Sequence, residues 1–403
     1  MFKSLKNPCA LYTILWCVYN TQGVLYASGS LISQTTLAML LLWSLVDAGR
    51  LFNEYAIPKF LKSLRWMLMI ILVYGFIAYL TDGATIRGKA DSTPTIDWFK
   101  MYLMSILPIF SYYYYAKKGY LTSKWVCQWM LVFSLVVLCA FFNGLWQMRG
   151  GQDVDDGVTN NAGYFVLSFM PLLLLMEKRI AQYFFMSFCI VLIIFAMKRG
   201  AIIGGSLVSV LLLLHRLKDT SKQKKILVIM SIAILLCGLF YFISDFYSTN
   251  TYFQYRLEAT REGNASGRDD IYETLLNHIL SNGNLFGMIF GEGALATTKI
   301  TWTAAHNDWL EFMVDMGLIG FVSYVVYWGQ FAKLTINKSL TTNARFGLAL
   351  LAIIYFLKTL VSMSLSDMTF LSSMAFGLFL ADSKTDKIRY DKNTHSRRFY
   401  SGK

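Results

Sequence analysis

Long apolar runs separated by short polar stretches dominate the hydropathy pattern of this chain. The runs repeatedly reach about 20 residues, the length at which an α-helix crosses a bilayer core of roughly 30 Å. The pattern predicts an all-α polytopic membrane protein with about twelve transmembrane helices, whose boundaries carry an error of a few residues. The expected spans are residues 10–28, 31–48, 64–81, 98–116, 125–145, 161–176, 181–197, 201–215, 226–245, 309–332, 346–364 and 368–382.

One long polar excursion interrupts this pattern, over residues 246–308. The other connections on the same predicted side are shorter, so this excursion is expected to form a large helical loop on the outer face of the membrane. Residues 1–382 are therefore expected to form a single transmembrane domain that includes the loop. Residues 383–403 are polar and basic, and are expected to form an unstructured cytoplasmic tail.

Helix signals can be recognised at the two ends of the second half of the excursion. Ser266 is a good N-cap, and apolar residues then recur at helical spacing, which predicts an amphipathic helix. Its expected apolar positions are Ile271, Leu275, Leu276 and Ile279.

A second N-cap, Asn307, precedes another helix, which is expected to end at Gly317. A transmembrane helix then starts from Gly320. A glycine-rich turn at residues 290–293 precedes the helix that follows Asn307 and the transmembrane helix that starts from Gly320.

The distribution of basic residues predicts the orientation in the membrane. Short cytoplasmic connections retain Lys and Arg, and most of the 37 basic residues fall in alternate connections and in the tail. Both termini are therefore expected to be cytoplasmic. The net charge of +13 is explained by this topology, so nucleic acid is not an expected partner. An apolar first segment after Lys3 and Lys6 resembles a signal peptide, but the charge alternation holds only if the segment is retained.

Several chemical classes lack their sequence signals. The six cysteines form no CxxC pair and are expected to act as small apolar residues. No HExxH motif, Cys/His set or Asp-rich cluster indicates a metal site, and no Walker loop indicates nucleotide binding. No metal and no cofactor are expected.

Two residues of the excursion can carry chemistry on an anionic substrate. Arg268 is in the first turn of its predicted helix, where the helix dipole opposes a cation. It is either a surface residue paired with a neighbouring carboxylate or a bidentate phosphate ligand. His306 immediately precedes the capped start of a helix, where backbone N–H groups favour an anion. It is either an ordinary loop residue, a proton acceptor or a phosphate ligand.

Further cations and polar groups are candidates for binding the same substrate. Lys198 and Arg199 form a turn predicted to face outside, against the positive-inside tendency. They either bind lipid headgroups or line a site for a diphosphate. Lys358 lies within a predicted span, where a charge is costly and usually partnered. Asn307 and Glu311 lie next to His306, and Glu311 either orients the His306 ring or is a solvated helix residue.

Four motifs in a fixed order resemble the O-antigen ligase and O-antigen polymerase superfamily of bacterial membrane glycosyltransferases. They are Lys198-Arg199-Gly200-Ala201, Ser266-Gly267-Arg268, Phe290-Gly291-Glu292-Gly293, and His306-Asn307 followed after nine residues by Gly317-Leu318-Ile319-Gly320.

The resemblance implies a GT-C-like membrane glycosyltransferase architecture in the bacterial inner membrane, with the active loop in the periplasm. Family members transfer a glycan from an undecaprenyl diphosphate-linked donor to an acceptor hydroxyl, with inversion and without a metal ion. The acceptor is a further glycan repeat for a polymerase and lipid A-core for a ligase, and the sequence leaves both open. By the resemblance, Arg199, Arg268 and His306 are the catalytic residues, and fixed guanidinium groups would stabilise the charge that develops on the departing diphosphate.

Two other classes of function are alternatives. A flippase for lipid-linked oligosaccharides also has about twelve spans, but would be expected to carry ionisable or helix-breaking residues near the bilayer midplane. In this chain the spans are poor in charge and the polar residues concentrate in one outer loop. A structural or sensory membrane protein is the third option, and no signalling domain supports it.

Overall fold

The computed structural model describes residues 7–83, 85–86, 93–149, 160–218, 268–281 and 284–384, and single residues at 226, 241, 244, 248, 254 and 258. The predicted span 226–245, the motif residues Ser266 and Gly267, and the tail beyond residue 384 lie outside these ranges. The first half contains α1 (Pro8–Asn20), α2 (Leu31–Glu54), α3 (Lys59–Asp82), α4 (Thr95–Lys117), α5 (Ser123–Arg149), α6 (Ala162–Phe169), the 3₁₀ helix η2 (Met170–Leu175), α7 (Arg179–Phe195) and α8 (Arg199–Lys218).

The second half contains α11 (Arg268–Ser281), α12 (Leu285–Phe290), α13 (Ala296–Thr301), α14 (Asp308–Thr335), α15 (Thr342–Val361), η3 (Leu365–Asp367) and α16 (Phe370–Ala381). Two short strands, β1 (Thr85–Ile86) and β2 (Thr93–Pro94), pair antiparallel between α3 and α4. The all-helical membrane class predicted from the hydropathy is confirmed, apart from this small ladder.

Six of the described helices are long and apolar enough to cross a membrane: α2, α3, α5, α8, α14 and α15. Shorter apolar helices cover residues 162–175, 179–195 and 370–381. The expected count of about twelve spans is thus not confirmed. The first expected span, 10–28, is shorter than predicted because α1 ends at Asn20, where the side chains of Asn20 and Thr21 bond back to the carbonyls of the last turn.

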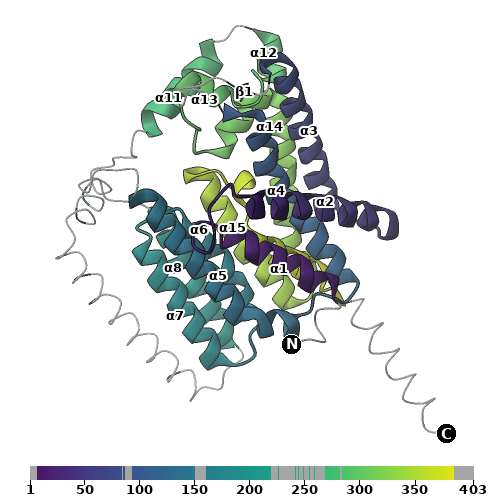
Figure 1. The fold of residues 1–403 in the computed structure, drawn as a ribbon, viewed down its shortest axis with the longest axis vertical. Helices are drawn as coiled ribbons and strands as arrows, with labels where there is room; N and C mark the ends of the chain where they lie inside the picture. Colours follow the sequence, from purple (N-terminus) through teal and green to yellow (C-terminus); the bar gives the residue numbers. More distant parts are fainter. Residues whose placement is uncertain are drawn as a thin grey trace.

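The described helices pack in two groups that α15 joins (Figure 1). One group contains α1 to α4, α14 and α16, and the other contains α5 to α8. The helix α15 contacts α14 on one side and α8 on the other. Glycines permit the closest approaches: a side chain at Gly377 of α16 would meet the backbone of Tyr112 in α4 at 2.5 Å. Small residues serve this purpose wherever membrane helices pack closely.

The three short helices α11, α12 and α13 gather at one end of the bundle, beside β1 and the ends of α3 and α14 (Figure 1). Helices α11 and α13 form a small apolar core with the start of α14, in which Leu275 of α11 is fully buried and Ile271 and Ile279 are partly buried. The predicted amphipathic helix is therefore confirmed. Leu276 is instead 47% exposed, because α11 packs along the narrow stripe of positions 271, 275 and 279.

Candidate functional site

The loop that carries His306 is fixed by the start of α14. The predicted N-cap is confirmed, since the Asn307 carboxamide oxygen accepts hydrogen bonds from Trp309 N at 2.9 Å and Leu310 N at 3.3 Å. His306 has a φ of 52°, in the left-handed region that non-glycine residues seldom adopt. Such strained residues concentrate at binding and catalytic sites.

The break expected at Gly317 is also confirmed, because Gly317 has a φ of 60° and a ψ of −156° inside α14. The glycine-rich turn packs directly against this break. A side chain at Gly317 would lie 2.6 Å from the carbonyl oxygen of Ile289, and one at Gly291 would lie 2.4 Å from the Gly317 nitrogen. Only glycine fits at either position, since both also have positive φ.

The same turn binds the carbonyl groups that the break leaves free. Glu292 N donates to Val314 O and Gly293 N donates to Asp315 O, each at 2.9 Å. The Gly-Glu-Gly motif is therefore a cap for the broken helix. The motif holds the connection between α12 and α13 on α14, which is not the role of a nucleotide-binding glycine loop.

A stripe of buried carboxylates on the first turns of α14 holds the loops around it. Asp308, Glu311 and Asp315 are each at most 2% exposed. Glu311 accepts hydrogen bonds from the Thr297 hydroxyl and from Ala305 N, both at 2.9 Å, and Asp315 accepts from two backbone N–H groups at the start of α13. Glu311 thus positions the backbone just before His306. It is neither of the two alternatives considered from the sequence.

Asp308 joins the start of α14 to the connection after α15. Its carboxylate accepts from Ser364 N at 3.0 Å, from Leu365 N at 3.1 Å and from the Tyr324 hydroxyl at 2.7 Å. These bonds fix the His306 loop relative to η3.

Two lysine ammonium groups lie near the ring of Tyr164 in α6. The Lys198 ammonium lies 5.9 Å from the centroid of the Tyr164 ring, and the Lys358 ammonium lies 4.8 Å from it. Lys358 is only 3% exposed and forms an ion pair with Asp367, which is mostly exposed. The expectation that Lys358 is partnered is confirmed. Lys358 and Lys198 therefore approach one aromatic ring from α15 and from the turn before α8.

Arg268, the first residue of α11, acts on the same tyrosine. Its guanidinium acts electrostatically on the phenol of Tyr164, on the ring of His306 and on Tyr272. The Tyr272 hydroxyl lies 3.4 Å from the carbonyl oxygen of His306 and 3.3 Å from that of Leu360, the residue near the end of α15. Tyr272 thus ties α11, the His306 loop and α15 together.

The cations change the chemistry of His306. Burial lowers the pKa of His306 below its ordinary value of 6.5, and the positive charges of Arg268 and Lys198 lower it further. The imidazole is consequently neutral at neutral pH. It can accept a proton, or donate one hydrogen bond from its protonated nitrogen.

Most of the residues proposed from the sequence lie in one region of the structure, but they have different roles there. Lys198, Arg268, His306 and Lys358 form one cluster, which we call the cationic cluster. Arg199 begins α8 directly after Lys198 and is half-buried. Asn307 and Glu311 shape the backbone that carries His306. Tyr164, Tyr272, Asp308 and Asp367 were missed from the sequence; for Asp308, the spacing of carboxylates at 308, 311 and 315 on one helical face was an available signal.

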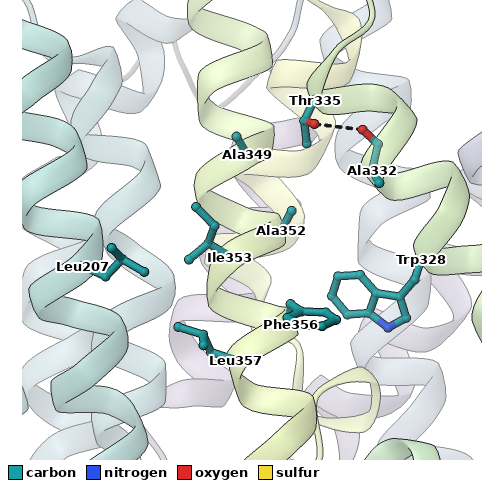
Figure 2. A pocket seen from close by; sticks show the side chains of 9 residues that line it. All are labelled: Leu207, Trp328, Ala332, Thr335, Ala349, Ala352, Ile353, Phe356 and Leu357. Atoms are coloured by element: carbon teal, nitrogen blue, oxygen red, sulfur yellow. Dashed lines mark hydrogen bonds between the residues drawn. The ribbon is translucent and has the colours of Figure 1, made fainter.

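An apolar groove of about 540 Å³ lies between α8, α14 and α15. Figure 2 shows side chains from the three helices turned into it. On α15, Leu357 of the groove directly precedes Lys358 of the cationic cluster, and on α8 Leu207 lies about 12 Å beyond Arg199 at 1.5 Å per residue. The groove is lined by Leu207, Trp328, Ala332, Thr335, Ala349, Ala352, Ile353, Phe356 and Leu357.

The fold and the cluster define a helical membrane protein with a cationic site at one end of the bundle, next to an apolar groove. Within the described ranges, no group of three or more His, Cys, Asp or Glu residues is placed to hold a metal ion.

The family model described as O-antigen ligase matches residues 184–325, about a third of the chain. The match contains Lys198, Arg199, Arg268 and His306, together with the Gly317 break, and it confirms the resemblance to the O-antigen ligase and polymerase superfamily. This resemblance associates the chain with a role in the assembly of surface polysaccharides. No curated protein matches the chain.

Proposed function

We propose that this protein is an inverting, metal-independent glycosyltransferase of surface polysaccharide assembly in the bacterial inner membrane. It transfers a glycan from undecaprenyl diphosphate to an acceptor hydroxyl at the periplasmic face, either as a polymerase or as an O-antigen ligase. The observation that carries this proposal is the cationic cluster: Lys198, Lys358 and Arg268 from three separate segments act on Tyr164, and Lys198 and Arg268 also act on His306.

The charge of the cluster suits a diphosphate. Among the described ion pairs, Lys358 has a carboxylate partner, and none joins Arg268 to a neighbouring acidic residue of α11. A guanidinium without such a partner can bind phosphate oxygens in a bidentate geometry. Arg268 is therefore assigned to the diphosphate, with Arg199 and Lys198 beside it.

The reaction breaks the bond between the anomeric carbon and the phosphate oxygen, and forms a bond from that carbon to the acceptor oxygen. The electron pair of the broken bond stays on the diphosphate, where fixed cations stabilise it. The acceptor hydroxyl loses its proton as it attacks. A neutral His306 is able to take this proton, or to bind a phosphate oxygen through its N–H, while the acceptor is aligned opposite the diphosphate.

The apolar groove supports the choice of a lipid-linked donor. It begins beside Lys358 and follows α15 away from the cluster, and it has an apolar lining. An isoprenoid chain attached to a diphosphate bound by the cluster would enter this groove. A diphosphate sugar without a lipid would leave it unused.

Reconstituted protein tests the proposal. Proteoliposomes would be supplied with undecaprenyl diphosphate-linked oligosaccharide and acceptor, and glycan transfer would be measured by mass spectrometry. Removing one charge-stabilising donor typically lowers turnover by about 10² to 10³. We expect this loss for Arg268→Ala and Arg199→Ala. Lys299→Ala is the matched control, because Lys299 is a cation of α13 in a half-exposed ion pair with Asp82.

Full transfer by both arginine variants would contradict the proposed site. Transfer that is lost in chelator and restored by a divalent ion would contradict the metal-independent mechanism. Translocation of the labelled lipid without transfer would favour a flippase. Gels of surface glycans from a deletion strain separate the two enzymes: core capped with a single repeat indicates a polymerase, and bare core with polymer on the carrier lipid indicates a ligase.

A further inference from the structure

A second, more polar cavity of about 270 Å³ lies beside the cationic cluster. Its walls come from the end of α5, the start of α6 and the connection before α16. Its polar side chains are Asn143, Asn160, Asn161, Asp367 and Thr369, and its aromatic side chain is Phe165.

The cavity is continuous with the cationic cluster through Asp367. One carboxylate oxygen of Asp367 is paired with the buried ammonium of Lys358, and the side chain is 64% exposed. Lys358 in turn lies over Tyr164. Asp367 therefore belongs to both the cationic cluster and the cavity. Its ion pair with Lys358 fixes its position, and its other carboxylate oxygen is available to accept a hydrogen bond in the cavity.

Two amides in the cavity are available for a ligand. Asn160 is fully buried and occupied, since its side chain donates to Phe141 O at 2.8 Å and accepts from Ala162 N at 2.9 Å. Asn161 caps α6 without a side-chain hydrogen bond and is exposed. Asn143 is half-buried. Within the described part of the chain, neither its side-chain amide nor that of Asn161 makes a hydrogen bond.

These groups match the surface of a sugar ring. Each amide offers both donors and an acceptor to neighbouring hydroxyls, and a carboxylate adds a strong acceptor. Phe165 is partly buried, and the electron-rich face of its ring suits the C–H face of a pyranose. The negative carboxylate of Asp367 disfavours a phosphate group in the cavity. The diphosphate is therefore expected to bind at the cationic cluster, and an uncharged sugar ring is expected to bind in the cavity.

We infer that this cavity is a carbohydrate subsite, in which Asn143, Asn161 and Asp367 bind the hydroxyl groups of a sugar ring next to the diphosphate site. The assignment rests on the proposed function for the identity of its ligand. The ring belongs either to the donor glycan or to the acceptor.

Binding of a free glycan tests the subsite without any transfer. Oligosaccharide released by mild acid from the surface polysaccharide of the source bacterium would be added to detergent-solubilised protein, and its affinity measured by saturation-transfer NMR. A hydrogen bond between neutral groups contributes about 0.5–1.5 kcal/mol, which corresponds to a roughly 2- to 12-fold change in affinity. We expect Asn161→Ala and Asn143→Ala each to weaken binding by this factor.

The control is Asn277→Ala, an exposed asparagine of α11 outside the cavity, which should bind like the wild type. Asn161 is exposed, so its variant keeps the fold even if the Asn143 variant does not. Wild-type affinity in Asn161→Ala, or an equal loss in Asn277→Ala, would overturn the subsite.

The transfer assay identifies which sugar occupies the cavity. A raised KM for the donor in Asn161→Ala assigns the ring to the donor glycan, and a raised KM for the acceptor assigns it to the acceptor. Unchanged KM for both overturns the inference. Arg268→Ala tests the proposed function separately, because retained transfer in that variant would refute the diphosphate site and leave the glycan-binding result standing.

Discussion

Replacing Asp308 by Asn tests whether the start of α14 holds the two sides of the site together. The Asp308 carboxylate accepts from Ser364 N, Leu365 N and the Tyr324 hydroxyl, and it is 2% exposed. All three donors are satisfied by this one group. The bonds from Ser364 and Leu365 determine where the connection between α15 and η3 lies.

The expected loss follows from the number of donors left without an acceptor. The Oδ2 oxygen accepts from all three donors and Oδ1 only from Ser364 N, so an asparagine with its oxygen at the Oδ2 position turns its NH₂ group toward Ser364 N and leaves about one donor poorly paired. A buried donor without a partner costs about 1–3 kcal/mol, which is the loss expected for the variant. For a chain of this length we expect the melting temperature to fall by about 1–4 °C.

Differential scanning fluorimetry of the detergent-solubilised protein measures this change. The matched control is Asp270→Asn, which alters an exposed carboxylate in the first turn of α11. Glycan transfer should also fall in Asp308→Asn, because Lys358 and Asp367 lie on either side of the connection that Asp308 fixes. A melting temperature lowered no more than in Asp270→Asn would show that the carboxylate is dispensable.

Three further outcomes are expected. Gly317→Ala should lower the melting temperature, since a methyl group there meets a carbonyl oxygen at 2.6 Å, whereas Gly329→Ala in open space on the same helix should not; equal effects would refute the role of the break. Ala352→Trp should fill the apolar groove and raise the KM for the lipid-linked donor, and Ala38→Trp, on the exposed face of α2, should leave it unchanged. Because the pKa of His306 is lowered on folding, its contribution to stability is complete above pH 6.5 and is lost as the pH falls through the folded pKa. Melting curves should show this acid-side loss in the wild type and a smaller one in His306→Gln.

Local features of the site could be predicted from the sequence because they depend on neighbours in the chain. The cap at Asn307, the break at Gly317 and the amphipathic pattern of α11 each rest on short-range backbone chemistry. The candidate cations Lys198, Arg268 and Lys358 could be proposed from their residue types and positions. The resemblance to a family supplied the catalytic assignments of Arg199, Arg268 and His306.

The contacts between segments could not be predicted in the same way. Nothing local indicates that Tyr164 lies between Lys198 and Lys358, or that Tyr272 reaches the backbone of the His306 loop. These contacts depend on how α15 packs between the two groups of helices. Glu311 shows the same limit, because a charged residue four positions after a helix cap is usually solvated, and only the fold buries it.

The charge balance of the site gives His306 a role that changes with the ligand. The positive charges of Arg268 and Lys198 act on the imidazole, so its protonated form is disfavoured. The negative charge of a bound diphosphate would offset this field, and the pKa of His306 would then rise. On the proposed function, His306 is therefore a poor proton acceptor in the empty site and a better one when the donor is bound. The histidine would take up the acceptor's proton only when the leaving group is in place, so the same cations that stabilise the diphosphate also determine when the base is competent.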